Sequence, residues 1–90
     1  MTEFYIAPAD LEKWIYQNDA SYTGMFVEGC LLDSFVLECR RGFAFVYEHF
    51  LNTWSSNYRV VFIPYRIGKR PEFDRAFAEW FEFASKARTA

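Results

Sequence analysis

Three glutamates recur at ten-residue intervals in the middle of the chain, Glu28, Glu38 and Glu48. Each falls in a segment with the period-two alternation of a β-strand, so one sheet can carry all three. Two neighbouring carboxylates can share general acid–base catalysis. Solvated positions on a sheet surface account for the same residues without any activity. We therefore expect these glutamates not to be catalytic.

The other reactive side chains are a single histidine, His49, and two cysteines, Cys30 and Cys39. The predicted strand pairing places His49 opposite Asp33, roughly 20 Å from Cys39 at the rise of a strand, which is too far for a Cys–His dyad. The spacing matches no zinc motif, and two cysteines are too few for a disulfide framework. The chain also has no phosphate-binding glycine loop. We expect reduced cysteines, no metal, no cofactor and no enzymatic activity.

The composition indicates what kind of domain positions these residues. The chain has 90 residues, of which 52% are hydrophobic and 22% aromatic, and its net charge is −2. This content is too apolar for a disordered segment, and residues 1–90 have room for only one core. The charge gives no bulk attraction to nucleic acid or anionic lipid. No segment is typical of a signal peptide or a membrane span, so we expect a soluble, cytoplasmic protein without membrane contact.

Two segments have the apolar periodicity of helices. Pro8 suits the first turn of a helix, and Leu11, Trp14 and Ile15 then form an apolar stripe that ends before residues 21–24. Pro71 suits the start of a second helix. Its wide apolar stripe can cover a sheet and consists of Phe73, Phe77, Trp80, Phe81 and Ala84.

Between the helices the alternation predicts four strands, at residues 25–32, 35–39, 43–50 and 58–65. Residues 40–42 fit a three-residue hairpin loop with Gly42 in the left-handed conformation. That loop pairs Cys39 with Phe43, Leu37 with Phe45 and Phe35 with Tyr47, which makes one face apolar throughout. The other face carries Val36, Glu38, Ala44, Val46 and Glu48.

Together these elements predict an α+β fold. We expect a two-layer sandwich with an N-terminal helix, a four-stranded antiparallel meander and a C-terminal helix packed on the sheet. The expected core joins rings of the strands to rings of the helices: Phe35, Phe43, Phe45 and Tyr47 against Trp14, Phe73, Phe77, Trp80 and Phe81.

Residues 41–48, Arg-Gly-Phe-Ala-Phe-Val-Tyr-Glu, resemble the ribonucleoprotein octamer of RNA-recognition-motif domains. The resemblance implies that Phe43 and Phe45 stack on bases. The chain departs from the family at Glu48, where an aromatic residue is typical, and in having another predicted strand where the family has a helix. Leu37 and Cys39 also share the predicted face with both rings, which favours a core position.

Two surfaces are candidates for binding. Three aromatic residues fall outside the predicted core and are candidate partner-binding residues: Trp54, Tyr16 and Phe83. Five basic residues meet at one end of the predicted sheet and are candidate anion-binding residues: Arg40, Arg41, Arg66, Lys69 and Arg70.

These observations favour a non-enzymatic protein-interaction module that binds another protein or a second copy of itself as a homodimer. Small proteins of this class are often inhibitors, adaptors or accessory factors, including those of phages and plasmids. The alternative is binding of nucleic acid or another polyanion through the basic end, that is, the 40–42 turn with residues 66–70.

Overall fold

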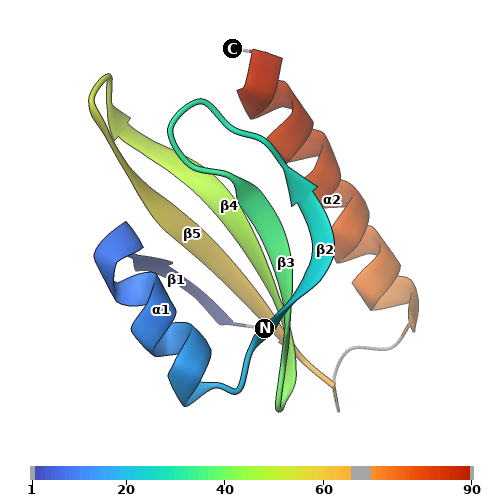
Figure 1. The fold of residues 1–90 in the computed structure, drawn as a ribbon. Coiled ribbons are helices and arrows are strands. Elements are labelled where there is room, and N and C mark those ends of the chain that lie inside the picture. Colours follow the sequence, from blue (N-terminus) through green and yellow to red (C-terminus); the bar gives the residue numbers. More distant parts are fainter. Residues whose placement is uncertain (1, 66–69, 90) are drawn as a thin grey trace.

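The computed structural model describes residues 2–65 and 70–89, and its side chains at 2–65 and 73–86. Within these residues the fold is α+β, with five antiparallel strands in one sheet and two helices (Figure 1). The strands lie in the order β1-β5-β4-β3-β2. The elements are β1 (Thr2–Ile6), α1 (Pro8–Gln17), β2 (Ser21–Val27), β3 (Ser34–Cys39), β4 (Gly42–Asn52), β5 (Ser55–Pro64) and α2 (Arg70–Thr89).

The first strand is an addition to the predicted four-stranded meander. β1 lies at one edge and pairs with β5 in a continuous register from Thr2 opposite Phe62 to Ile6 opposite Tyr58. The order of the meander is confirmed, because β2, β3, β4 and β5 are neighbours in chain order. Its first strand covers Ser21–Val27 and not residues 25–32 as predicted, because residues 28–33 form a loop that is held by Glu48. Five residues carry little periodicity of their own, and the partner of β1 lies more than fifty residues further along the chain. Local patterns therefore could not place this strand.

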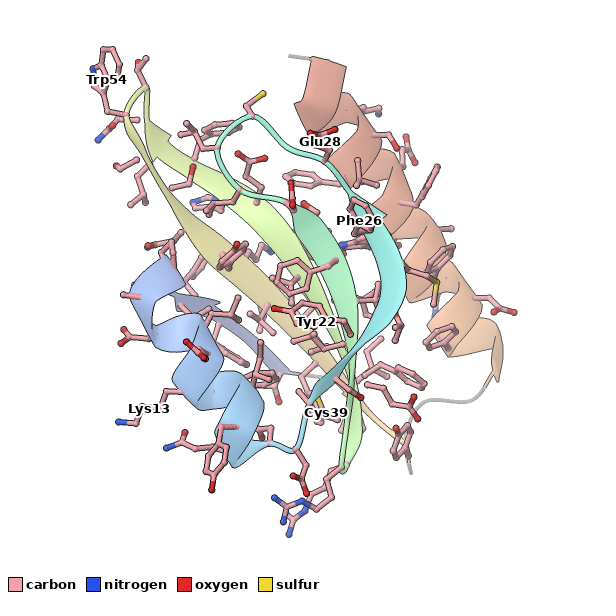
Figure 2. The ribbon with its side chains drawn as sticks, in the orientation of Figure 1. Lys13, Tyr22, Phe26, Glu28, Cys39 and Trp54 are labelled. Carbon is pink, nitrogen blue, oxygen red and sulfur yellow. The ribbon has the colours of Figure 1, made fainter. Side chains whose placement is uncertain are left out.

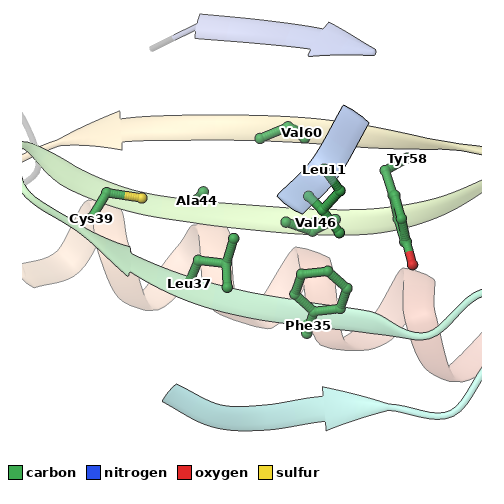
Figure 3. Close-up of a cluster of buried hydrophobic side chains, with 8 residues drawn as sticks. All are labelled: Leu11, Phe35, Leu37, Cys39, Ala44, Val46, Tyr58 and Val60. Atoms are coloured by element: carbon green, nitrogen blue, oxygen red, sulfur yellow. The ribbon is translucent and has the colours of Figure 1, made fainter. Parts of the chain in front are cut away.

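The two helices lie on opposite faces of the sheet, so the molecule has three layers where we expected two (Figure 1). Leu11 of α1 packs against the cluster on one face, and Trp80 of α2 packs against the cluster on the other. The α1-side cluster comprises Leu11, Phe35, Leu37, Cys39, Ala44, Val46, Tyr58 and Val60 (Figure 3). The α2-side cluster comprises Val27, Val36, Phe45, Tyr47, Val61, Ile63, Trp80 and Ala84.

The hairpin between β3 and β4 differs by one residue from the predicted register. Arg40 and Arg41 form a two-residue turn, so that Cys39 lies opposite Gly42 and Val36 opposite Phe45. Since side chains alternate between faces, a shift of one residue moves every side chain of one strand to the other face. The single apolar face that we predicted is therefore wrong. Phe35, Leu37 and Cys39 face α1, whereas Phe45 and Tyr47 face α2.

Gly42 explains why the register was misplaced. It does not occupy the left-handed region, because Gly24 is the only glycine with a positive φ in the described part of the chain. Gly42 instead lies within β4, where an added Cβ would collide with the carbonyl oxygen of Ile63 and the ring of Phe62. This glycine is required by the close approach of β5 and not by a turn.

Both helices form where their proline and apolar stripes predict them. α1 begins at Pro8 and buries Leu11, and Trp80 of α2 is only 1% exposed. The indole Nε1–H of Trp80 donates a hydrogen bond of 2.9 Å to the carbonyl oxygen of Val46, which anchors α2 to β4. Phe81, expected in the core, is 53% exposed at the margin of the stripe. Neither helix in the described residues is long and apolar enough to cross a membrane.

Candidate functional site

The recurring glutamates do not form a carboxylate pair. Glu38 and Glu48 were predicted to share a face, but the observed register pairs Glu38 with Phe43. Paired residues share a face and successive residues alternate, so Glu38 and Glu48 face opposite sides of the sheet. Glu48 is 1% exposed and accepts backbone hydrogen bonds from the loop after β2. Glu28 is exposed at the start of that loop (Figure 2). The three carboxylates occupy three different environments.

Glu48 holds the loop of residues 28–33. Its Oε2 accepts the N–H of Cys30 at 3.1 Å, and its Oε1 accepts the N–H groups of Leu31 at 2.7 Å and Leu32 at 2.9 Å. The N–H of Glu48 in turn donates to Oγ of buried Ser34 at 2.9 Å. A buried carboxylate requires such compensation. Glu48 therefore joins the loop to the centre of the sheet.

His49 and Cys39 lie towards opposite ends of the β3–β4 hairpin. His49 pairs with Asn57 on the β5 side of β4, and the one-residue shift of the β3–β4 register moves it out of the predicted position opposite Asp33. Its ring centroid lies 4.9 Å from that of Tyr5. Cys30 is exposed, whereas Cys39 is buried. Burial, together with the nearby carboxylate of Glu38, raises the pKa of the Cys39 thiol to about 11. Among the residues with described positions, no three His, Cys, Asp or Glu side chains are grouped to hold a metal ion.

The three predicted partner-binding aromatics are exposed but lie far apart. Trp54 is 89% exposed at the tip of the β4–β5 hairpin (Figure 2). Tyr16 is 86% exposed on α1, near the other end of β4, where the N–H of Arg40 donates to the carbonyl of Asn18. Phe83 is 41% exposed on α2 and contacts Tyr47 edge-on. They do not form one surface.

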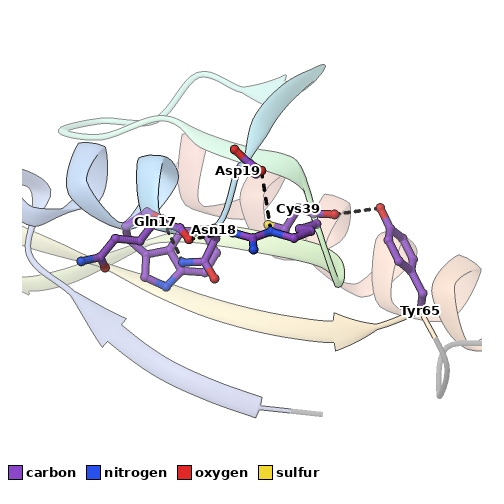
Figure 4. A network of polar contacts seen from close by, with 7 residues as sticks. Gln17, Asn18, Asp19, Cys39 and Tyr65 are labelled. Atoms are coloured by element: carbon purple, nitrogen blue, oxygen red, sulfur yellow. Dashed lines mark hydrogen bonds and ion pairs between the residues drawn. The ribbon is translucent and has the colours of Figure 1, made fainter.

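Only part of the predicted basic end is described. Arg40 and Arg41 form the exposed β3–β4 turn, and the guanidinium of Arg40 lies 3.6 Å from the carboxylate of Asp19 (Figure 4). Arg40 also donates to the carbonyl oxygen of Gln17. Arg66 and Lys69 lie outside the described residues, as does the side chain of Arg70. The proposed clustering of the five basic residues therefore remains a prediction.

The rings of the ribonucleoprotein-like octamer are packed against α2. Phe45 is fully buried, and Phe43 is half-buried. Both contact Phe73, with ring centroids 4.7 Å away for Phe43 and 5.6 Å for Phe45. Stacking on bases requires open rings on a sheet surface. The helix covers this face, so the role implied by the resemblance does not fit the structure.

A surface that the sequence did not reveal lies along β2, which in the described part of the chain pairs with β3 alone and forms the second edge of the sheet. Tyr22 lies opposite Leu37 and Phe26 opposite Phe35, so three residues of β2 bulge opposite Val36. Gly24 lies in the bulge with a φ of 88°, a conformation that other residues rarely adopt. Hydrogen bonds fix the bulge, because the hydroxyl of Thr23 donates to the carbonyl of Val36 at 2.8 Å and accepts the N–H of Met25 at 3.2 Å.

The edge is apolar and exposed. Tyr22 is 62% exposed, Phe26 64% and Met25 37%, and residues 20–27 include no charged side chain. Tyr22 and Phe26 project from β2 in Figure 2. We call β2 with these three side chains the β2 edge. The sequence carried one signal for it, the uncharged aromatic segment between Asp19 and Glu28, but we assigned its first half to a helix-ending break.

Two grooves border the β2 edge. The Glu38 groove, of about 630 Å³, is lined by Tyr22, Met25, Glu38, Phe43, Tyr65 and Phe73, among others. The Asp33 groove, of about 420 Å³, is lined by Leu11, Tyr22, Phe26, Asp33, Phe35 and Tyr58, among others. Tyr22 and Met25 line both grooves, so the edge strand separates two hollows that each contain aromatic rings and one carboxylate.

Tyr65 organises the Glu38 groove. Its hydroxyl donates to the carbonyl oxygen of Cys39 at 3.0 Å and lies 3.3 Å from Oε1 of Glu38 (Figure 4 shows the first of these contacts). Its ring meets the ring of Phe43 edge-on, with centroids 5.2 Å apart. Desolvation, with the neighbouring Glu38 as the second cause, raises the pKa of Tyr65.

Comparison with known proteins adds no further information, because no protein-family model, no curated protein and no solved structure matches this chain.

Proposed function

We propose that this protein is a non-enzymatic protein-binding module whose partner docks at the β2 edge. The observation that carries the proposal is an edge strand with no charged residue and three exposed apolar side chains, bordered by a groove on either side. Exposed strand edges in soluble proteins are usually protected by charges, prolines, bulges or covering segments, and β2 has a bulge but no charge or proline. An uncharged, apolar edge is typical of a surface that a partner covers.

The mode of binding follows from the open side of the strand. A partner segment in extended conformation can add to β2 through main-chain hydrogen bonds and send alternate side chains to the two faces of the sheet. The Glu38 and Asp33 grooves lie where such side chains would arrive. The bulge at residues 23–25 restricts the pairing to part of the strand, which favours a short segment.

The environments of the reactive groups support a non-enzymatic role. Both oxygens of Glu48 accept backbone hydrogen bonds, and Cys39 has a thiol pKa too high for a nucleophile at neutral pH. His49 packs against the ring of Tyr5 on β1.

The test is selection of twelve-residue peptides from a displayed random library on the wild-type protein, followed by calorimetry with the selected synthetic peptides. Phe26→Lys places a charge on the exposed edge, and we expect it to weaken binding by about tenfold or more through lost apolar contact and a charged edge. Tyr16→Lys is the matched control, because Tyr16 is 86% exposed on α1 and lies outside the β2 edge. We expect this variant to bind the peptides as wild type does. Circular dichroism verifies that both variants fold.

Other results would contradict the proposal. Peptides that bind Phe26→Lys as well as wild type but lose affinity for Trp54→Ala would locate the interface at the hairpin tip. Failure to select any peptide, together with salt-sensitive binding of a DNA or RNA oligonucleotide that Arg41→Glu abolishes, would support the polyanion alternative.

A further inference from the structure

We propose, on the basis of the proposed function, that the Glu38 groove receives an arginine or lysine side chain from the strand that adds to β2. The partner is thus an extended polypeptide segment with a basic residue among apolar ones. Glu38, the rings beside it and the distribution of charge around β2 carry this inference.

The charges that face the β2 edge are acidic. Glu38 lines one groove and Asp33 the other, and Glu28 follows β2 directly. No lysine, arginine or histidine is among the described residues that line either groove. Asp19, at the start of β2, is the exception among the nearby carboxylates, since Arg40 lies 3.6 Å from it. Within the described residues, an incoming cation therefore meets carboxylates and no basic side chain in either groove, which favours its association.

Aromatic rings add a second attraction for a cation. Phe43, Tyr65 and Phe73 lie beside Glu38, and Phe43 contacts both of the other rings, at 5.2 Å and 4.7 Å between centroids. A guanidinium or ammonium group over a ring face is attracted by the ring quadrupole, and the methylene stem of the side chain covers apolar surface. A carboxylate among rings is thus selective for a cation on an apolar stem.

The position of Glu38 suits a side chain that arrives from beyond β2. Glu38 lies directly opposite Ser21 of β2, a residue with a small side chain. An added strand would lie one further strand spacing away, about 4.8 Å beyond β2. A long basic side chain on that strand can pass over Ser21 and meet the carboxylate of Glu38, which itself extends towards solvent.

A second copy of this chain fits the surface less well. If the β2 edges of two copies paired, each would offer the other only residues 20–27, which contain no basic side chain. Glu38 and Asp33 would then face apolar and acidic neighbours, and their charges would stay uncompensated. Charge complementarity therefore favours a different polypeptide.

The experiment uses the peptides selected on the wild-type protein. We expect enrichment of arginine or lysine at one position. We also expect norleucine at that position to weaken binding to the wild type by about tenfold, as for a lost charge-assisted contact. Glu38→Gln preserves the shape of the groove and removes its charge, so the same norleucine substitution should hardly change binding to this variant. Glu12→Gln, on the exposed side of α1, is the matched control and should behave like wild type.

The outcomes separate this inference from the proposed function. Peptides that lose affinity for Phe26→Lys, but carry no enriched basic residue and bind Glu38→Gln unchanged, would overturn the role of the groove and leave binding at β2 intact. A concentration-dependent dimer that Phe26→Lys dissociates, measured by light scattering, would replace the polypeptide partner by a second copy. Failure of all peptides to bind would reject both proposals.

Discussion

The two edge strands of the sheet, β1 and β2, have different chemistry although each exposes a tyrosine. Tyr5 on β1 is 53% exposed and Tyr22 on β2 is 62% exposed. The ring of Tyr5 packs against His49, and on the same strand Glu3 forms an ion pair of 3.1 Å with Arg59. β2 has no charged residue and is bordered by grooves. Exposure of a ring therefore does not by itself distinguish the two edges, whereas the charges and hollows around the ring do.

The β1 edge has a charged protection that the β2 edge lacks. The guanidinium of Arg59 lies 4.9 Å from the ring centroid of Tyr47 while its NH2 group donates to Glu3, so one cation joins β1, β4 and β5. Charged groups along an edge disfavour the addition of a further strand. β1 also pairs with β5 without a bulge, whereas β2 departs from β3 at residues 23–25.

The largest expected effect concerns Glu48, which holds the loop that follows the β2 edge. In Glu48→Gln the amide oxygen can still accept from Leu31 and Leu32, but the amide NH2 group would face the N–H of Cys30. We expect a loss of about 2 kcal/mol in the free energy of unfolding in urea, because hydrogen bonds to a charged acceptor are lost. Hydrogen exchange at residues 30–32 should accelerate.

Glu3→Gln provides the comparison for that prediction, since it removes a carboxylate from the other edge. An exposed ion pair contributes little to stability, so its unfolding midpoint in urea should shift less than that of Glu48→Gln. Equal shifts for the two variants would show that the loop of residues 28–33 does not depend on Glu48.

A smaller effect is expected at the bulge of β2. An added Cβ at Gly24 would meet no atom within 4 Å, so Gly24→Ala tests the backbone conformation alone. With a φ of 88°, alanine should cost about 1 kcal/mol of unfolding free energy. Unchanged stability would mean that the bulge rearranges freely, and hydrogen exchange of Met25 would then differ from that of wild type.

The smallest effect concerns pH and the β1 edge. The hydrogen bond and charge of Arg59 lower the pKa of Glu3 from its usual value of 4.5. A carboxyl with a depressed pKa in the folded state contributes stability above its unfolded pKa, and this contribution is lost as the pH falls through the folded value. Between pH 7 and pH 3, wild type should therefore lose slightly more stability than Glu3→Gln. Parallel pH curves in low salt would show that the ion pair contributes nothing.

The helices and the order of the meander could be predicted because local features determine them. Pro8 and Pro71 mark the starts of the helices, and the apolar stripe of α2 includes Trp80, which is buried as expected. The register at the β3–β4 turn could not be predicted. Gly42 fits a left-handed turn residue as well as a close crossing, and only the position of β5 distinguishes the two.

The candidate site was less predictable than the fold. The aromatic residues Trp54, Tyr16 and Phe83 are exposed, as their place outside the stripes indicated, but nothing local shows that they lie apart. The Glu38 groove depends on contacts among β2, β3, β4, β5 and α2. Assignment of Glu38 and Phe43 to opposite faces separated two residues that in fact line the same groove.

The pairing of β1 with β5 has a consequence for synthesis of the chain. β1 leaves the ribosome before the other strands of this sheet, yet its partner ends at Pro64, so its main-chain groups stay without their sheet partner until β5 has been made. β2, β3 and β4 can meanwhile pair as successive neighbours. The nascent sheet therefore grows towards β5, and the N-terminal strand completes it last.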